Sequence, residues 1–278
     1  MGFAYVIAHV AAGAIAGAMK GAFHPLVIVA VADLGATIVV FAFSRAFDNS
    51  SFYDAYWSLA PVTIAWWLAL LPGDSLTLRQ WLVLGLVSLY GARLTFNWAR
   101  GWTGLGHEDW RYVDLRKSSG KLYWVVSFFG LHFFPTVCVF LGVLPLHAVL
   151  IEARAGFSWL DIVAALVTLG AIVIEAVADE QLRNFRASKA KEICEVGLWS
   201  VSRHPNYFGE ISFWFGLWLF GVAAGAPWWS ASGVVAMIAL FNFASIPLAE
   251  KRSLERRPGF AEHQRRVSKL IPWFRRSA

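Results

Sequence analysis

Charged residues are scarce in this chain. Asp, Glu, Lys and Arg together make up 15% of its 278 residues, while 58% are hydrophobic. A soluble domain normally carries about 25% charged residues, so the composition excludes an ordinary soluble fold. Several apolar segments approach or exceed the roughly 20 residues that a helix needs to cross a hydrocarbon core. The sequence therefore predicts an all-α, polytopic membrane protein.

Cysteine is nearly absent, which bears on two kinds of site. The two cysteines, Cys138 in an apolar span and Cys194 in a loop, give no disulfide framework. Neither has a second Cys or a His at metal-ligand spacing, so we expect no metal site.

Three further patterns are missing. The glycines at 101, 104 and 106 follow no strand, so they form no Rossmann fingerprint, and any nicotinamide cofactor would need an all-helical site. The net charge of +6 is not arranged as one basic stripe with stacking aromatics, which argues against nucleic acid as a partner. No second interrupted hydrophobic segment suggests an inverted-repeat transporter.

Seven apolar segments are candidate membrane spans, with boundaries near 25–46, 54–71, 79–99, 124–150, 158–182, 207–225 and 229–249. Residues 3–19 form an eighth, shorter stretch rich in Ala and Gly, and the lack of a basic region before it argues against a cleaved signal peptide. We expect this stretch to be a short helix lying on or partly in the membrane, with a true span as the alternative. The predicted organisation is thus an N-terminal segment, 1–24, followed by one seven-helix domain, 25–278.

Basic residues concentrate in the 100–121 loop, the 183–206 loop and the tail from Lys251 onward. By the positive-inside rule these segments and the C-terminus face the cytoplasm.

One helical face in the second half is strongly polar. Glu175, Asp179, Arg183 and Arg186 follow one another at steps of four, four and three residues, which places them on the same side of a helix. A helix end whose arginines snorkel to the interface would look the same. The functional interpretation is a cationic face for a phosphorylated ligand, because guanidinium groups bind phosphate oxygens in bidentate fashion.

A second polar group opens the next span. Pro205 suits the first turn of a helix, and Asn206 and Glu210 then lie one turn apart on it. Such groups at the mouth of an apolar helix are costly unless something polar binds there. We expect a ligand-binding cluster made of Arg203, His204, Asn206, Tyr207 and Glu210.

The tail contains a third group of residues that could bind the same anionic ligand. Arg252 and Arg256 lie in the charged stretch Glu250–Phe260. The alternative is an amphipathic helix bound to anionic lipid headgroups.

The first half holds a different group. Asp54 lies near the cytoplasmic start of its predicted span, beside Tyr53, Tyr56 and Trp57. Tyr90 and Arg93 lie one turn apart in the next span. Intramembrane ionisable residues are functional hypotheses by default. A structural Asp54–Arg93 ion pair is the simpler alternative.

Together these segments resemble the steroid 5α-reductase family, and most closely its bacterial branch of membrane proteins of undefined substrate. The resemblance covers roughly residues 25–278 and rests on Asp179–Arg186, on Gly197–Trp199 with Arg203–Glu210, and on Leu270–Trp273. It implies a monomeric seven-helix enzyme of the bacterial inner membrane. Such an enzyme binds NADPH from the cytoplasm and takes a lipophilic enone from the bilayer. It then adds hydride to the β-carbon of the conjugated double bond.

The resemblance also implies residue roles. Asp179, Arg183, Arg186, Asn206 and Glu210 match cofactor contacts of the family, and Tyr90 matches the tyrosine that faces the substrate ketone.

Two departures leave other roles open. The family's catalytic acid has no direct counterpart, so Tyr53 and Asp54 are its candidate replacements, with Tyr56, Trp57 and Arg93 around the substrate. Arg252 and Arg256 stand where His and Tyr tail contacts are expected.

A second family shares part of the pattern. Isoprenylcysteine and phospholipid methyltransferases carry a similar Arg-His-Pro core and use S-adenosylmethionine. Two features favour the reductase. Glu210 stands after Gly209, where the methyltransferases usually have an apolar or aromatic residue, and a phosphate-free cofactor does not require the two arginines Arg183 and Arg186. A non-enzymatic lipid transporter or binding protein is the remaining alternative.

Overall fold

The computed structural model describes residues 1–152, 155–189 and 192–275, and all elements of these segments are helical. In chain order they are α1 (Gly2–Met19), α2 (Pro25–Ala46), η1 (Ser50–Tyr53), α3 (Tyr56–Leu70), α4 (Leu78–Ala99), α5 (Trp110–Ser119), η2 (Gly120–Leu122), α6 (Tyr123–Ser127), η3 (Phe128–Phe133), α7 (Phe134–His147), η4 (Ala148–Glu152), α8 (Trp159–Lys189), η5 (Gly197–Ser200), α9 (Pro205–Ala223), η6 (Trp228–Ala231), α10 (Ser232–Leu240), η7 (Phe241–Ser245), α11 (Ile246–Arg256) and α12 (Phe260–Arg266). The predicted all-α class is confirmed.

Two of the long rods contain π-helical turns. η3 joins α6 to α7, and η7 joins α10 to α11, so each set forms one continuous rod. A proline lies within the first two positions of both α7 and α11. Proline has no backbone N–H to donate, and a widened turn is one way for a helix to accommodate it. The second rod continues to Arg256, beyond the span end predicted at 249.

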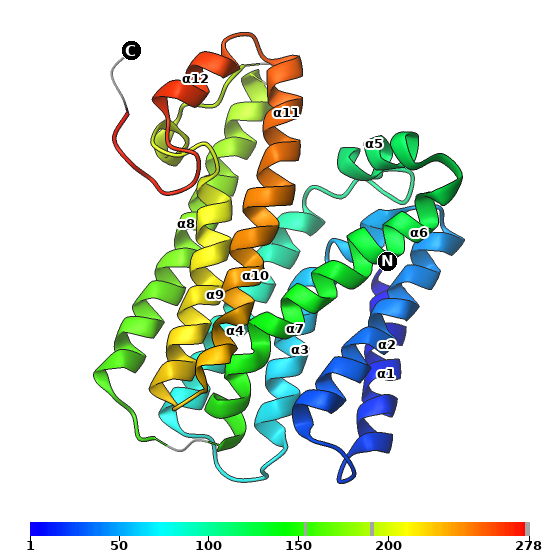
Figure 1. Cartoon of the computed structure of the whole chain (residues 1–278), viewed down its shortest axis with the longest axis vertical. Coiled ribbons are helices and arrows are strands. Elements are labelled where there is room, and N and C mark those ends of the chain that lie inside the picture. The colour runs from blue at the N-terminus through cyan, green and yellow to red at the C-terminus, as the bar shows by residue number, and fades with distance from the viewer. Residues whose placement is uncertain (153–154, 190–191, 276–278) are drawn as a thin grey trace.

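Five helical segments are long and apolar enough to cross a membrane: Gly2–Met19, Pro25–Ala46, Trp110–Glu152, Trp159–Ser188 and Trp228–Arg256. This identifies an integral membrane protein. The predicted spans at α3, α4 and α9 also form helices, and these run beside the five in the same bundle (Figure 1).

The N-terminal helix corrects the preferred expectation for residues 3–19. α1 does not lie across the bundle but runs along α2 (Figure 1), with the Phe3 and Phe43 rings 6.3 Å apart near one end. A Cβ on Gly35 would lie 2.3 Å from Ile15 Cδ1, so the two helices are in close contact. Ala4, Tyr5 and Ala8 belong to the main buried core. The alternative, a true span, agrees better with this packing.

The basic segments gather at one end of the bundle, called here the basic end, which also carries α5, α11 and α12 (Figure 1).

The opposite end contains a buried arginine, although the positive-inside rule predicts few basic residues there. Arg79 is 4% exposed, and its Nε lies 2.6 Å from Asp161 Oδ1. The guanidinium also donates to the carbonyl oxygens of Ala155, Gly156 and Ala223. Arg79 is therefore neutralised inside the protein and joins α4, α8 and α9.

Candidate functional site

Close helix contacts set the positions of the polar side chains. A Cβ on Gly209 would lie 2.9 Å from the Ala171 carbonyl oxygen and from Glu175 Cβ, and one on Gly216 would lie 2.1 Å from Thr168 Oγ1. α9 can approach α8 this closely only because these positions lack side chains. As a result Glu210, next to Gly209, shares one buried layer with Glu175.

The deepest group centres on Glu210, which is 4% exposed. Its Oε1 accepts three hydrogen bonds: from the Tyr90 hydroxyl at 2.6 Å, from Trp57 Nε1 at 3.1 Å and from Trp214 Nε1 at 3.0 Å. Trp57 Nε1 also lies 3.2 Å from the Tyr90 hydroxyl oxygen. The Tyr90 ring is stacked on Phe213, with centroids 3.8 Å apart. Tyr90 and Glu210 thus form one fixed polar pair in an aromatic cage.

Arg93 forms the next layer, one turn along α4. Its Nη2 lies 2.6 Å from Glu175 Oε1, and its Nη1 donates to Asp179 Oδ2 at 3.0 Å. Asn97 donates to the same Asp179 oxygen at 2.9 Å. These partners exclude the Asp54–Arg93 ion pair considered above. Three carboxyl groups, those of Glu175, Asp179 and Glu210, are gathered near this single guanidinium.

Arg183 and Asn206 extend this layer toward the basic end. Asn206 Nδ2 lies 3.4 Å from Asp179 Oδ1, and Arg183 Nη2 lies 3.3 Å from Asn97 Oδ1. Both contacts are long, so the two side chains retain hydrogen-bonding capacity. Arg183 Nε is buried and makes no hydrogen bond.

The layers around Glu210, Arg93 and Arg183 form one polar column, and a group of arginines lies at its outer end. This group, called here the arginine rim, consists of Arg186, Arg252, Arg256 and Arg257. Arg257 is surrounded by Arg186, Arg252 and Arg256, and burial together with these charges lowers its pKa. Arg252 also lies 4.1 Å from the centre of the Trp110 ring and 3.4 Å from Asp114. Within the described residues no carboxylate pairs with Arg186 or Arg257. Such a cluster is an anion-binding arrangement.

Arg203 and His204 have a different role from the one expected. Arg203 Nε lies 2.7 Å from Glu250 Oε1, and Nη1 donates to the carbonyl oxygens of Gln264 and Val267. His204 Nε2 lies 3.2 Å from the same Glu250 oxygen. Both side chains therefore hold the tail against α9 and α11 rather than facing the arginine rim.

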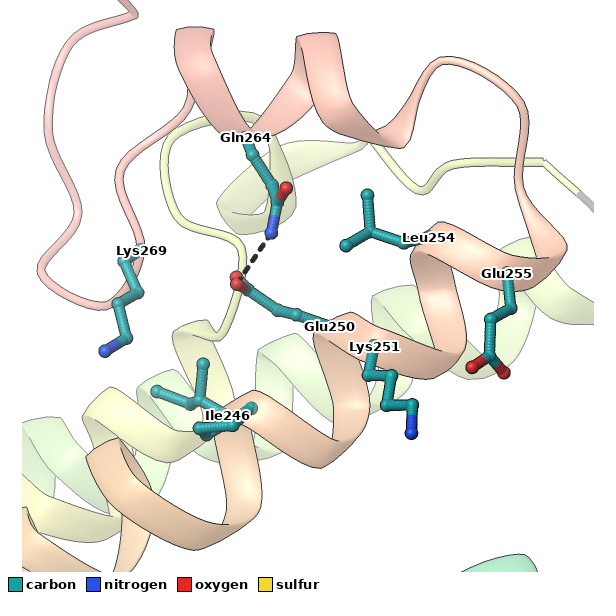
Figure 2. A pocket seen from close by; sticks show the side chains of 8 residues that line it. Ile246, Glu250, Lys251, Leu254, Glu255, Gln264 and Lys269 are labelled. Carbon is teal, nitrogen blue, oxygen red and sulfur yellow. Dashed lines mark hydrogen bonds between the residues drawn. The ribbon is translucent and has the colours of Figure 1, made fainter.

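A cavity of about 550 Å³ lies between α11 and the tail (Figure 2). Glu250 and Gln264 meet in its wall, with Gln264 Nε2 donating to Glu250 Oε2 at 2.8 Å. The cavity wall therefore includes Glu250, the carboxylate that also binds Arg203 and His204. These contacts, which hold the tail on the bundle, are called here the tail clamp.

Tyr53 and Tyr56 lie apart from Tyr90. The Tyr53 hydroxyl is 2.7 Å from Thr136 Oγ1, and the Tyr56 hydroxyl donates to Asp33 Oδ1 at 2.6 Å. Of the aromatic residues expected around the substrate, only Trp57 contacts Tyr90.

Asp54 also lies apart from Tyr90, in the segment before α3, where its Oδ1 accepts a hydrogen bond from Tyr112. Burial raises the pKa of Asp54 from 3.8 to about 6, although Arg111 and Tyr112 act to lower it. A carboxyl with this pKa is mostly ionised at neutral pH. Asp54 therefore lacks both the position and the proton needed to donate to a ketone held by Tyr90.

Other residues of the column were not singled out from the sequence. Trp214 is one of 15 tryptophans, and nothing in its local pattern distinguishes it. Asn97 is a polar residue near the end of an apolar helix, and that position could have marked it. Arg257 could have been found, because it adjoins Arg256 in the basic tail and directly follows the last residue of α11. Tyr207, which the sequence placed in the ligand-binding cluster, lies on α9 and stacks on His204 with ring centroids 5.4 Å apart.

Comparison with known proteins assigns the chain to a family. Residues 40–267 match the family described as "Protein of unknown function (DUF1295)". The chain belongs to the DUF1295 family. Uncharacterized protein C594.04c of Schizosaccharomyces pombe is 26% identical over 252 residues, which cover 81% of this chain and 73% of that relative. No solved structure matches the chain.

The DUF1295 match contains the whole polar column, from Trp57 to Arg257, and the tail clamp. It begins at residue 40, so α1 and most of α2 lie outside it. Among the described residues no group of three or more His, Cys, Asp or Glu side chains is placed to hold a metal ion.

The first prediction for this DUF1295 member compares Arg93 of α4 with Arg100, the residue that follows this helix. Arg93→Met should lower the free energy of unfolding by about 3–5 kcal/mol, because it leaves buried carboxylates without their partner. Arg100→Met removes an exposed pair with Glu180 and should cost about 1 kcal/mol or less. Denaturant unfolding of both variants in one detergent measures this, and equal losses would show that Arg93 is not a buried anchor.

The second prediction concerns pH. Because the pKa of Asp54 is raised from 3.8 to about 6, folding favours its protonated form, and this stabilisation is complete only below about pH 4. The melting temperature of the wild type minus that of Asp54→Asn should therefore fall as pH rises from about 4 to 6 and then level off. A difference that stays flat over this window would mean that Asp54 titrates with its ordinary pKa.

Proposed function

We propose that the protein is an NADPH-dependent membrane reductase acting on the carbon–carbon double bond of an α,β-unsaturated ketone, such as a 3-oxo-4-ene steroid-like lipid. The observation that carries this proposal is the buried Tyr90–Glu210 pair, connected through Arg93 and Asp179 to an arginine rim. The likeness of these segments to steroid 5α-reductases supports it.

The proposed location is the bacterial inner membrane with the basic end in the cytoplasm. The positive-inside rule supports this orientation, and it gives the arginine rim access to a soluble cofactor.

The rim has the chemistry to hold the phosphate groups of NADPH. Arg186 and Arg257 lack carboxylate partners among the described residues, and Arg252 lies beside them. Asn206 and Arg183 have hydrogen-bonding capacity to position the rest of the cofactor. When bound, NADPH supplies the hydride. Arg203 and His204 act through the tail clamp in this proposal, and they do not contact phosphate.

Tyr90 is the proposed donor to the substrate ketone. Negative charge builds on the ketone oxygen during hydride addition, and a donor aimed at that oxygen stabilises the transition state more than the ground state. When the Tyr90 proton turns from Glu210 to the ketone, Glu210 Oε1 keeps its hydrogen bonds from Trp57 and Trp214. The change therefore leaves Glu210 Oε1 hydrogen-bonded. Trp57 also donates toward the Tyr90 oxygen, which makes its hydroxyl a better donor.

One observation favours a second candidate, an S-adenosylmethionine-dependent methyltransferase. The Glu175, Asp179 and Glu210 carboxyl groups outnumber the nearby Arg93 guanidinium. A sulfonium cation would suit this excess of acidic groups. The arginine rim has no function in that candidate, because S-adenosylmethionine carries no phosphate.

The third prediction tests the rim. Arg257→Ala and Arg186→Ala should each weaken NADPH binding by about 1.5–3 kcal/mol, the usual value of a hydrogen bond to a charged group. Arg265→Ala, which removes an exposed arginine of α12, should bind NADPH as the wild type does. Equilibrium binding of NADPH to the purified variants decides the matter. Unchanged affinity in both rim variants would remove the rim from the cofactor site.

The fourth prediction tests Tyr90. Tyr90→Phe keeps the ring stacked on Phe213 but deletes the donor, and should lower turnover of a 3-oxo-4-ene steroid by about 10²–10³-fold. NADPH affinity should be unchanged, because the rim is intact. Equal turnover by wild type and Tyr90→Phe would assign the ketone contact to another group.

A further inference from the structure

A separate cavity lies between α1, α2 and α3. It has a volume of about 100 Å³, and most of its walls are apolar. Its polar side chains belong to His9, Asp33, Tyr56 and Thr63. The apolar walls are formed largely by small residues: Ala12, Gly13, Ala16, Ala32, Ala36 and Ala60. Gly13 and Thr63 are exposed, so the cavity reaches the side of the bundle.

Asp33 is the unusual member of this cavity. It is 4% exposed, and its Oδ1 accepts the hydrogen bond from Tyr56, while the buried Oδ2 has no hydrogen-bond partner. A buried polar atom without a partner is costly, and the cost is greater in a membrane span. Asp33 is the ninth residue of α2, about 12 Å from its first residue at 1.5 Å per residue. The orphaned oxygen therefore lies deep in a span.

This cavity is distinct from the proposed active site. Tyr56 and Trp57 are neighbours on α3, yet Tyr56 bonds Asp33 whereas Trp57 bonds Glu210. α1 and Asp33 also precede residue 40, where the family match begins. Neither NADPH nor the enone of the proposed reaction explains the Asp33 side chain.

The size and chemistry of the cavity limit the kinds of ligand that it can bind. A cavity of about 150 Å³ holds benzene, so about 100 Å³ admits only one end of an amphiphile. A phosphate headgroup would bring negative charge to Asp33. A hydroxyl can both donate and accept a hydrogen bond, so it pairs with Oδ2 whether or not the carboxyl holds the proton.

We propose that this cavity binds the hydroxyl end of a lipid alcohol on Asp33 Oδ2, with the hydrocarbon chain leaving between α1 and α3 at Gly13 and Thr63. The small residues of α1, α2 and α3 provide the space for the first carbons of the chain. The ligand binds from the bilayer and needs no contact with the arginine rim.

The test uses the full-length protein in phosphatidylcholine vesicles and a photoreactive probe, hexadecan-1-ol bearing a diazirine and a terminal alkyne. After illumination, mass spectrometry should find the probe on residues 9–16, 28–36 and 60–67. Unlabelled hexadecan-1-ol should compete, whereas hexadecane, which has no polar atom, should not. The measurement requires no enzyme activity, so it stands apart from the reductase proposal.

Two variants should each prevent the hydrogen bond to Oδ2 and reduce this labelling by roughly tenfold, the upper end of what a typical hydrogen bond contributes. Asp33→Leu removes the polar atom, and Gly13→Leu fills the cavity while keeping Asp33. A Cβ at Gly13 meets no atom within 4 Å, so the first atom of the new side chain has room beside α1. Asp33→Asn is the matched control, because an amide still pairs with both Tyr56 and a hydroxyl, and it should label nearly as the wild type does.

Labelling elsewhere on the chain, equal competition by hexadecane, or full labelling of Gly13→Leu would overturn the proposal. If Asp33→Leu fails to fold, Gly13→Leu decides the matter alone.

Discussion

The arrangement of the bundle depends on one guanidinium. Arg93 on α4 is held between Glu175 and Asp179 on α8, in a region where its side chain is 12% exposed. Charges taken out of water are tolerated only when they are paired and hydrogen-bonded. This pairing fixes the rotation of α4, so that Tyr90 points at Glu210 of α9. The glycine contacts between α8 and α9 bring the third helix close enough for this arrangement.

The apolar helices were largely predictable from the sequence, because in a membrane the length of an apolar run and the charge of its flanks determine a span. α2 has the predicted bounds of 25–46, and α4 differs by one residue at its start. α1 differs from the preferred prediction, because a short stretch rich in Ala and Gly can pack closely along a neighbouring helix. Its contact at Gly35 is visible only in three dimensions.

The site was predictable in part. The one-turn spacings predict a shared helix face for Tyr90 and Arg93, and another for Asn206 and Glu210. The structure brings both pairs into one column. Spacing along a helix gives the face of a residue but not its partner. Arg203 was therefore assigned to a ligand although it binds Glu250 and two carbonyl groups, and Asp54 was assigned to Tyr90 although it bonds Tyr112. Both errors arise from tail and loop contacts that are distant in sequence.

The most direct measurement of the central claim is cofactor-dependent thermal stabilisation of the purified protein. A ligand that binds the folded state alone raises the apparent stability by about 2.7 kcal/mol at 100 times its Kd. NADPH should raise the melting temperature with the logarithm of its concentration above Kd, NADH should do so much more weakly, and S-adenosylmethionine should have no effect. Stabilisation by S-adenosylmethionine and not by NADPH would contradict the account and favour the methyltransferase.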